Sequence, residues 1–107
     1  MQNIQDKIDA INEKFKQIED ETELKTLMLK KVLKIGEEYG ELCDAMLSEI
    51  GSQRKSKLNS YDSQDFKEEL ADVIVTALTL ARYMDLDLKE LIMSKLNKIE
   101  KRFETEY

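Results

Sequence analysis

The sequence predicts an all-α protein, a four-helix, single-domain bundle formed by residues 1–107. The chain contains no proline and only 3 glycines, and residues that favour helices occur throughout it. A β-sheet would normally need more turn residues and more β-branched runs than this chain contains. At 107 residues one domain is expected, with a modest core, because small chains bury a smaller part of their surface.

The first two helices are expected at about residues 2–19 and 23–50. In the first, apolar residues repeat at alternating steps of four and three, which places them in one stripe on a helix. Thr22 is a candidate N-cap for the second helix. Gly36 and Gly40 lie inside that helix, and each costs about 1 kcal/mol relative to alanine. Their spacing fits close approach by another helix or a ligand, and it fits a local weakness of the helix equally well.

The second half of the chain predicts one loop and two further helices. Residues 51–62 are polar and basic without a periodic apolar pattern, so we expect a loop there. The third helix is expected at about residues 64–84, and its apolar residues occupy so much of its circumference that it should be the most buried. The fourth is expected at about residues 87–104, because Asp87 and Glu90 have the spacing of a capping box.

Charge and cysteine content restrict the class of protein. The net charge of −6 argues against binding to nucleic-acid polymers, which requires a basic surface. The single Cys43 forbids an internal disulfide and fits a reducing compartment. The first residues lack the pattern of a signal peptide, and the longest nearly apolar stretch, residues 73–81, is too short to cross a bilayer. We therefore expect a cytoplasmic protein that does not bind membranes.

The absence of histidine restricts the chemistry further. It excludes histidine general bases, triads built on histidine and histidine metal sites. One cysteine without histidine also argues against a structural zinc site within one chain. Any catalysis must therefore use carboxylates, lysine, arginine, tyrosine, hydroxyl groups or a hard metal ion.

Two pairs of carboxylates are the strongest candidates for a site. Glu38 and Glu41 lie three residues apart on the second helix, and Glu69 and Asp72 repeat this spacing on the third, so each pair shares a face. Asp72 opens the most hydrophobic stretch, where a charge is costly unless it is paired or binds a metal. If the two helices pack antiparallel, the pairs can converge on Mg²⁺, with Mn²⁺ as a substitute. Such pairs are also common on solvated helix faces, and both interpretations stay open.

Residues 34–42 (KIGEEYGEL) and 68–73 (EELADV) resemble the paired signature of the MazG-like all-α nucleoside triphosphate pyrophosphatases. That signature is EExxE on one helix and ExxD on the next, separated by a variable loop. Residues near the C-terminus also look like the closing helix of this family, so the resemblance covers about residues 30–104. It implies hydrolysis of a nucleoside triphosphate between the α- and β-phosphates, which gives the monophosphate and pyrophosphate. It also implies a homodimer or a homotetramer.

The resemblance assigns roles to five acidic residues. Glu38, Glu41, Glu69 and Asp72 match the ligands of the Mg²⁺ cofactor. Glu37, the first acid of the signature, is a candidate for orienting the attacking water, so that Glu37 and Glu38 form the catalytic pair. The metal would neutralise charge on the phosphates and lower the pKa of that water.

Four further residues are candidates for binding the substrate. Lys98 and Arg102 match positions that contact phosphates in relatives, although a solvated basic end of the last helix explains them equally well. Lys34 could contact a phosphate or pair with a neighbour on its helix. Thr79 stands where many members have asparagine, and the chain has no tryptophan to contact the base. Phe15 is the nearest aromatic substitute, but its place in the first apolar stripe favours a core position. A non-catalytic helical oligomerisation or nucleotide-sensing module is the alternative function.

Overall fold

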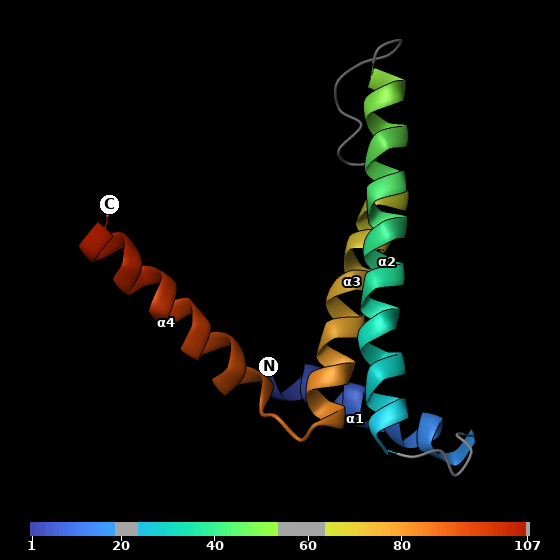
Figure 1. Cartoon of the computed structure of the whole chain (residues 1–107), viewed down its shortest axis with the longest axis vertical. Helices are drawn as coiled ribbons and strands as arrows, with labels where there is room; N and C mark the ends of the chain where they lie inside the picture. The colour runs from blue at the N-terminus through green and yellow to red at the C-terminus, as the bar shows by residue number, and fades with distance from the viewer. Residues whose placement is uncertain (19–23, 54–63, 107) are drawn as a thin grey trace. The chain divides into compact units, whose positions relative to one another are not determined.

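The computed structural model describes residues 1–18, 24–53 and 64–106. Within these residues it contains no strand and four helices, which are α1 (Gln2–Ile18), α2 (Leu24–Gln53), α3 (Gln64–Tyr83) and α4 (Leu88–Glu106) (Figure 1). The prediction of an all-α fold with four helices is therefore confirmed. No helix in the described part of the chain is long and apolar enough to span a membrane.

The ends of two helices differ from the sequence-based prediction. α2 continues to Gln53, so residues 51–53 are helical although they were predicted to begin the loop. One glycine costs about 1 kcal/mol in a helix, which is too little to end a helix of 30 residues once it is nucleated. α4 likewise continues to Glu106, beyond the predicted end near residue 104. The rest of the predicted loop and the candidate cap Thr22 lie outside the described residues.

The chain divides into two compact units. The α2–α3 unit comprises Glu21–Leu80, and the α1–α4 unit comprises Met1–Asp20 together with Ala81–Tyr107, which includes the last turn of α3. The expectation of one domain around a single core stays a prediction.

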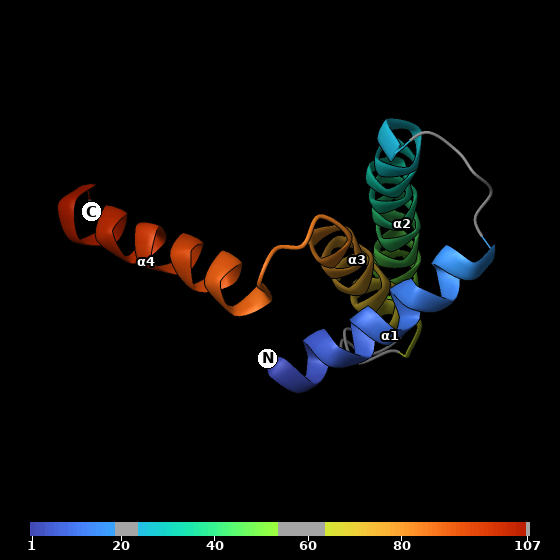
Figure 2. The ribbon, with the colours of Figure 1, turned by 90° about the horizontal axis from the view of Figure 1, so that it is seen from below.

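In the α2–α3 unit the two helices run side by side in opposite directions, as Figures 1 and 2 both show. Each helix turns one stripe of half-buried residues, spaced by three and four, toward the other. The prediction that α3 is the most buried helix agrees with the described residues, since α3 has the largest share of buried and half-buried positions of the four helices. Leu70, Ile74 and Val75 are exposed, because a pair of helices covers only one side of each.

The core of the α1–α4 unit consists of the apolar residues Ile8, Ala81 and Leu88. Gln5 is buried beside them, and its Oε1 accepts a hydrogen bond of 2.9 Å from the backbone N–H of Leu88. A backbone donor at the first turn of α4 has no partner within its own helix. Gln5 therefore satisfies a buried donor and ties α1 to the beginning of α4.

The corner between α3 and α4 is held by local hydrogen bonds. The N–H of Leu86 donates to the carbonyl of Ala81 at 3.0 Å, and the N–H of Asp85 donates to that of Arg82 at 2.9 Å. This is a Schellman motif, with Asp85 in the left-handed region at φ 62°. Asp87 then caps α4, since its Oδ2 accepts a hydrogen bond of 3.0 Å from the N–H of Glu90. The predicted start of the fourth helix is correct.

A two-point ion pair joins α1 to the end of α3. Arg82 donates from Nε to Oδ1 of Asp9 at 2.7 Å and from Nη2 to Oδ2 at 3.0 Å, and its Nη1 donates to the carbonyl of Leu86 at 2.9 Å. These hydrogen bonds hold the pKa of Asp9 below its ordinary value. Two parallel bonds between a guanidinium and a carboxylate fix geometry as well as charge.

Candidate metal centre

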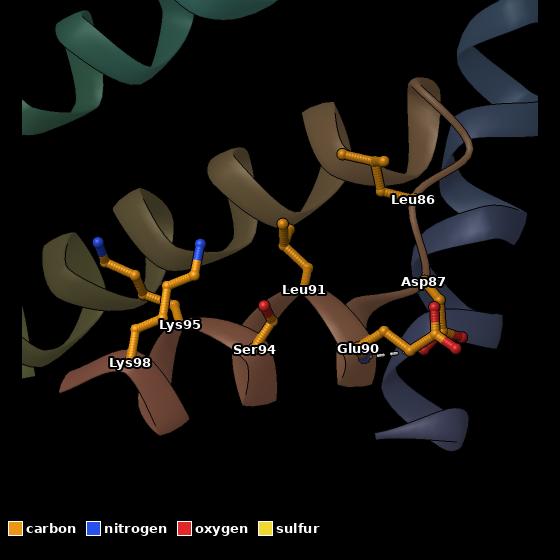
Figure 3. Close-up of a pocket in the computed structure, with 7 residues that line it drawn as sticks. All are labelled: Leu86, Asp87, Glu90, Leu91, Ser94, Lys95 and Lys98. Atoms are coloured by element: carbon orange, nitrogen blue, oxygen red, sulfur yellow. Dashed lines mark hydrogen bonds between the residues drawn. The ribbon is translucent and has the colours of Figure 1, made fainter. Parts of the chain in front are cut away.

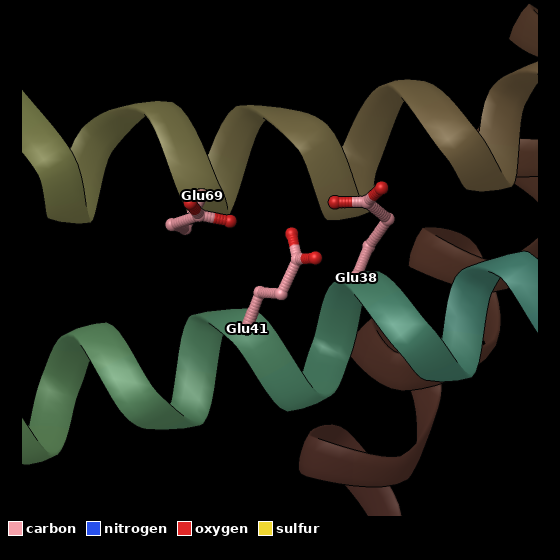
Figure 4. Close-up of side chains that lie close together, drawn as sticks. All are labelled: Glu38, Glu41 and Glu69. Carbon is pink, nitrogen blue, oxygen red and sulfur yellow. The ribbon is translucent and has the colours of Figure 1, made fainter.

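Three of the four predicted carboxylates come together between α2 and α3. One carboxylate oxygen from each of Glu38, Glu41 and Glu69 lies within 4.8 Å of the others. Figure 4 shows Glu38 and Glu41 projecting from α2 toward α3, which carries Glu69. The spacing of three residues puts the first two on one face, and the antiparallel pairing of the helices brings the third opposite them. The described residues contain one such acidic group.

Two oxygens of this group are shielded from solvent and have no hydrogen-bond partner, namely Oε2 of Glu38 and Oε2 of Glu69. Glu38 is only 8% exposed. A buried polar atom without a partner costs about 1–3 kcal/mol, and more when it carries charge. A hard cation with oxygen ligands would satisfy both atoms. The carboxylate oxygens present therefore suit the coordination of a divalent metal ion.

The electrostatics of the group lead to the same inference. The negative charge of Glu38 raises the pKa of Glu41, and desolvation and a hydrogen bond with Glu38 raise it further. Lys34 places a positive charge beside this group. Its Nζ lies 3.2 Å from Oε1 of Glu38 and 3.4 Å from Oε1 of Glu37. Hydrogen bonds to these carboxylates raise the pKa of Lys34. The structure thus shows the helix ion pair that was one of two interpretations of Lys34.

Asp72 lies three residues after Glu69 on α3, but it is exposed and is not a member of the group of three. Leu70 and Ile74 near it are exposed as well, although Val73 is half-buried, so the apolar stretch does not bury the charge of Asp72. The backbone carbonyl of Asp72 accepts a hydrogen bond of 2.5 Å from Oγ1 of Thr76. Thr79 is half-buried, and its Oγ1 donates to the carbonyl of Thr76 at 2.7 Å. The roles of Asp72 as a ligand and of Thr79 in binding substrate stay predictions.

A pocket of about 410 Å³ adjoins the group and is lined by further acids that the sequence analysis did not single out. Its lining is Glu41, Asp44, Ala45, Ser48, Glu49, Asp65 and Glu69. The sequence spacing could have indicated Asp44 and Asp65. Asp44 follows Glu41 by three residues, and Asp65 precedes Glu69 by four. Both acidic pairs therefore extend by one helical turn toward this pocket.

The predicted phosphate contacts on α4 belong to the other unit. Lys98 lines a pocket of about 400 Å³ together with Leu86, Asp87, Glu90, Leu91, Ser94 and Lys95. Figure 3 shows this pocket, with the amino groups of Lys95 and Lys98 at one end and the carboxylates of Asp87 and Glu90 at the other. Arg102 is exposed one turn after Lys98. The roles of Lys98 and Arg102 in binding phosphates stay predictions.

Comparison with protein families identifies the chain. The model of the MazG nucleotide pyrophosphohydrolase domain matches residues 25–105, which is most of the sequence. The chain belongs to the MazG nucleotide pyrophosphohydrolase family. A search of curated proteins and a search of solved structures each found no match.

Membership of the MazG family supports, at the level of the family, hydrolase activity on nucleotides that depends on a metal ion. The matched residues include α2 from Lys25 onward, all of α3 and almost all of α4. Every residue proposed for the site therefore lies within the MazG match. The resemblance inferred from the sequence motifs is confirmed.

Proposed function

We propose that the chain is a Mg²⁺-dependent nucleoside triphosphate pyrophosphohydrolase. It cleaves ribo- or deoxyribonucleoside triphosphates between the α- and β-phosphates, and a house-cleaning role toward non-standard nucleotides suits this reaction. The observation that carries the proposal is the group formed by Glu38, Glu41 and Glu69, with two buried oxygens that lack hydrogen-bond partners. It lies within the part of the chain that matches the MazG family.

In this proposal Glu38, Glu41, Glu69 and Asp72 hold the Mg²⁺ ion, and Mn²⁺ can replace it. A bound ion would neutralise charge on the phosphates and lower the pKa of a bound water. The protein is acidic and its substrate is a polyanion, so four carboxylates alone would repel the nucleotide. The metal requirement follows from this charge balance.

Two residues beside the ligands have separate proposed roles. Glu37 is exposed next to the group, where its carboxylate can accept a proton from water and orient it. Lys34 bridges Glu37 and Glu38, and its ammonium group carries positive charge to the edge of the site. A phosphate can compete for this ammonium, since an exposed ion pair on a helix contributes only about 0.3–0.5 kcal/mol. Lys34 thereby becomes available to the substrate.

The remaining proposed contacts are Thr79 on α3 and the basic pair Lys98 and Arg102 on α4. Arg102 suits a terminal phosphate because its guanidinium can donate two parallel hydrogen bonds. We propose that the protein functions in the cytoplasm as a homodimer or homotetramer. This assembly would cover part of the apolar surface that remains exposed in one chain.

The test is incubation of the purified chain with a panel of nucleoside triphosphates and Mg²⁺, scored for monophosphate and pyrophosphate. Glu69→Gln and Asp72→Asn should abolish turnover, whereas Glu13→Gln, which changes an exposed carboxylate on α1, should leave it unchanged. No turnover of any triphosphate with Mg²⁺ or Mn²⁺ would refute the proposal and leave a nucleotide-sensing or oligomerisation module. Orthophosphate as the first product would place the cleavage at a different bond.

A further inference from the structure

One edge of α2 changes from basic to acidic along the helix. Six polar residues follow one another there at alternating steps of four and three, which is the spacing of a single helix face. They are Lys30, Lys34, Glu37, Glu41, Asp44 and Ser48. All six are exposed, and the sign of the charge changes beside the candidate metal centre, to which Glu41 belongs. A ligand lying along this edge would meet cations on one side of that centre and acids on the other.

The acidic side of the centre is hollow. The pocket of about 410 Å³ begins at Glu41 and Glu69 and reaches Ser48 and Glu49. Its volume is within the range of pockets that hold small ligands. Figure 4 shows Glu69 beyond Glu41, on the side away from Glu38. The pocket and the candidate metal centre therefore share two carboxylates, and a ligand bound at the centre can extend into the pocket.

The acids that line the rest of the pocket are not neutralised by the protein. The side chains of Asp44, Glu49 and Asp65 form no ion pair or hydrogen bond with another described residue. Asp44 and Asp65 are exposed, whereas Glu49 is half-buried. An ionised carboxylate accepts hydrogen bonds and donates none, and its burial is costly when no donor replaces the lost water. Glu49 therefore favours a ligand that supplies an N–H donor.

The candidate metal centre gives an independent indication of a ligand at the other end of the pocket. Oε2 of Glu38 and Oε2 of Glu69 are shielded from solvent and have no hydrogen-bond partner, and Glu38 is only 8% exposed. Glu69 also lines the pocket. The cation proposed for these atoms would hold phosphates where the pocket begins.

The spacing along α2 suits a nucleotide that lies parallel to the helix. At about 1.5 Å per residue, Ser48 and Glu49 lie about 10–12 Å beyond Glu41, while Lys34 and Lys30 lie about 10 and 16 Å before it. In an extended nucleoside triphosphate the base and the terminal phosphate lie on opposite sides of the α-phosphate. Phosphates that bind at the centre and point toward the lysines therefore leave the base at the far end of the pocket, beside Glu49.

We propose that this pocket binds the nucleoside of the substrate and that Glu49 selects bases with an exocyclic amino group. The carboxylate of Glu49 accepts a hydrogen bond from the amino group of cytosine, adenine or guanine. It repels the carbonyl oxygen that uracil and thymine present in place of the amino group of cytosine. Lys30, on the basic side of the centre, binds the terminal phosphate. The inference rests on the proposed function, from which it takes the nucleotide and the metal ion.

The first experiment measures binding without hydrolysis. The full chain is titrated, in Mg²⁺, with the α,β-methylene analogues of CTP and UTP, which cannot be cleaved between the α- and β-phosphates. The cytidine analogue should bind about tenfold more tightly or better, because a hydrogen bond to a charged acceptor is lost with uridine. In Glu49→Gln the preference should fall below about twofold, since an amide both donates and accepts. Glu13→Gln, an exposed change of the same kind on α1, should keep the preference.

The second experiment tests the direction of the nucleotide. Lys30→Gln should weaken the binding of both analogues by a similar factor of about two to five, since an exposed cation is removed from the terminal phosphate. The affinity for CMP, which lacks that phosphate, should not change. Lys7→Gln, an exposed change of the same charge on α1, should alter neither affinity.

Equal affinities for the two analogues in the natural chain would overturn the inference, as would a preference that Glu49→Gln retains. A preference for ribose over deoxyribose without a preference between bases would show that the acids bind sugar hydroxyls, and it would overturn the role of Glu49. Loss of CMP affinity in Lys30→Gln would overturn the direction along α2. A chain that hydrolyses CTP and UTP with equal kcat/KM would keep the proposed function and lose this inference. A chain that binds the analogues with the stated preference but hydrolyses no triphosphate would do the reverse.

Discussion

Replacing Glu38 by glutamine tests the metal centre without changing the size of the side chain. In the metal-free protein the change removes a charge that faces Glu41 and Glu69, and it also removes the ion pair with Lys34 at 3.2 Å. The second effect is small, because Lys34 is half-exposed and such pairs contribute about 0–1 kcal/mol. The two effects oppose each other, so we expect the metal-free stability to change by less than about 1 kcal/mol.

The response to Mg²⁺ should change far more. A ligand that binds only the folded state stabilises it by about 2.7 kcal/mol at 100 times its Kd. In a domain of this size that free energy corresponds to a rise in Tm of about 10–20 °C. Loss of a direct ligand should weaken binding at least as much as loss of an outer-shell partner, which costs about 10–100-fold. With a 100-fold loss the same Mg²⁺ concentration gives about 0.4 kcal/mol, or a rise of about 2–3 °C.

The assay is thermal unfolding followed by circular dichroism across a Mg²⁺ titration. Glu13→Gln is the matched control, since Glu13 is an exposed carboxylate that pairs with Lys16 at 3.4 Å on α1. It should keep the full shift of the natural chain. Equal shifts in the natural chain and in Glu38→Gln would refute the assignment of Glu38 as a ligand. A natural chain whose Tm does not respond to Mg²⁺ would refute the metal centre itself.

Three predictions concern the α1–α4 unit. Arg82 keeps the pKa of Asp9 below its ordinary value, so the ion pair stabilises the fold above pH 4 and its contribution is lost in more acidic solution. Asp9→Asn should therefore lower the free energy of unfolding in urea at pH 7 but not near pH 2, and a difference that is independent of pH would contradict this. Leu88→Ala should lower the free energy of unfolding by about 2–5 kcal/mol, because Leu88 is 0% exposed. Leu96→Ala should lower it by less than about 1 kcal/mol, because Leu96 is 45% exposed. Similar losses in the two variants would show that burial does not decide the effect. Asp87→Ala should cost about 1 kcal/mol through loss of the N-cap, and an unchanged unfolding midpoint would count against the cap.

Local patterns explain the parts of the fold that the sequence could predict. The apolar repeat gave the order of the helices, and the spacing of Asp87 and Glu90 gave the start of α4. The shared face of Glu38 and Glu41 follows from helix geometry alone. Their approach to Glu69 required the further assumption that the two helices pack antiparallel, which the structure bears out.

Contacts between distant segments could not be predicted. Gln5 looks like a surface residue by its type, yet its side chain accepts the N–H of Leu88, 83 positions away. Arg82 and Asp9 are 73 positions apart, and nothing in either local pattern pairs them. The exposure of Leu70, Ile74 and Val75 on α3 could not be predicted for a related reason. Periodicity shows which face of a helix is apolar, but it does not show how many neighbours one chain supplies to cover that face.

The corner at the end of α3 has a consequence for engineering. Asp85 holds φ 62°, where left-handed backbone costs most residues about 1–2 kcal/mol and costs aspartate and asparagine less, because their short side chains can form local hydrogen bonds. Glycine would remove that strain, but it would also increase the entropy of the unfolded chain by a comparable amount, about 0.4–1 kcal/mol. In a saturation library at position 85, glycine and asparagine should therefore score close to the natural residue. Valine and isoleucine should be the most depleted, because branching at Cβ makes this conformation the least accessible to them.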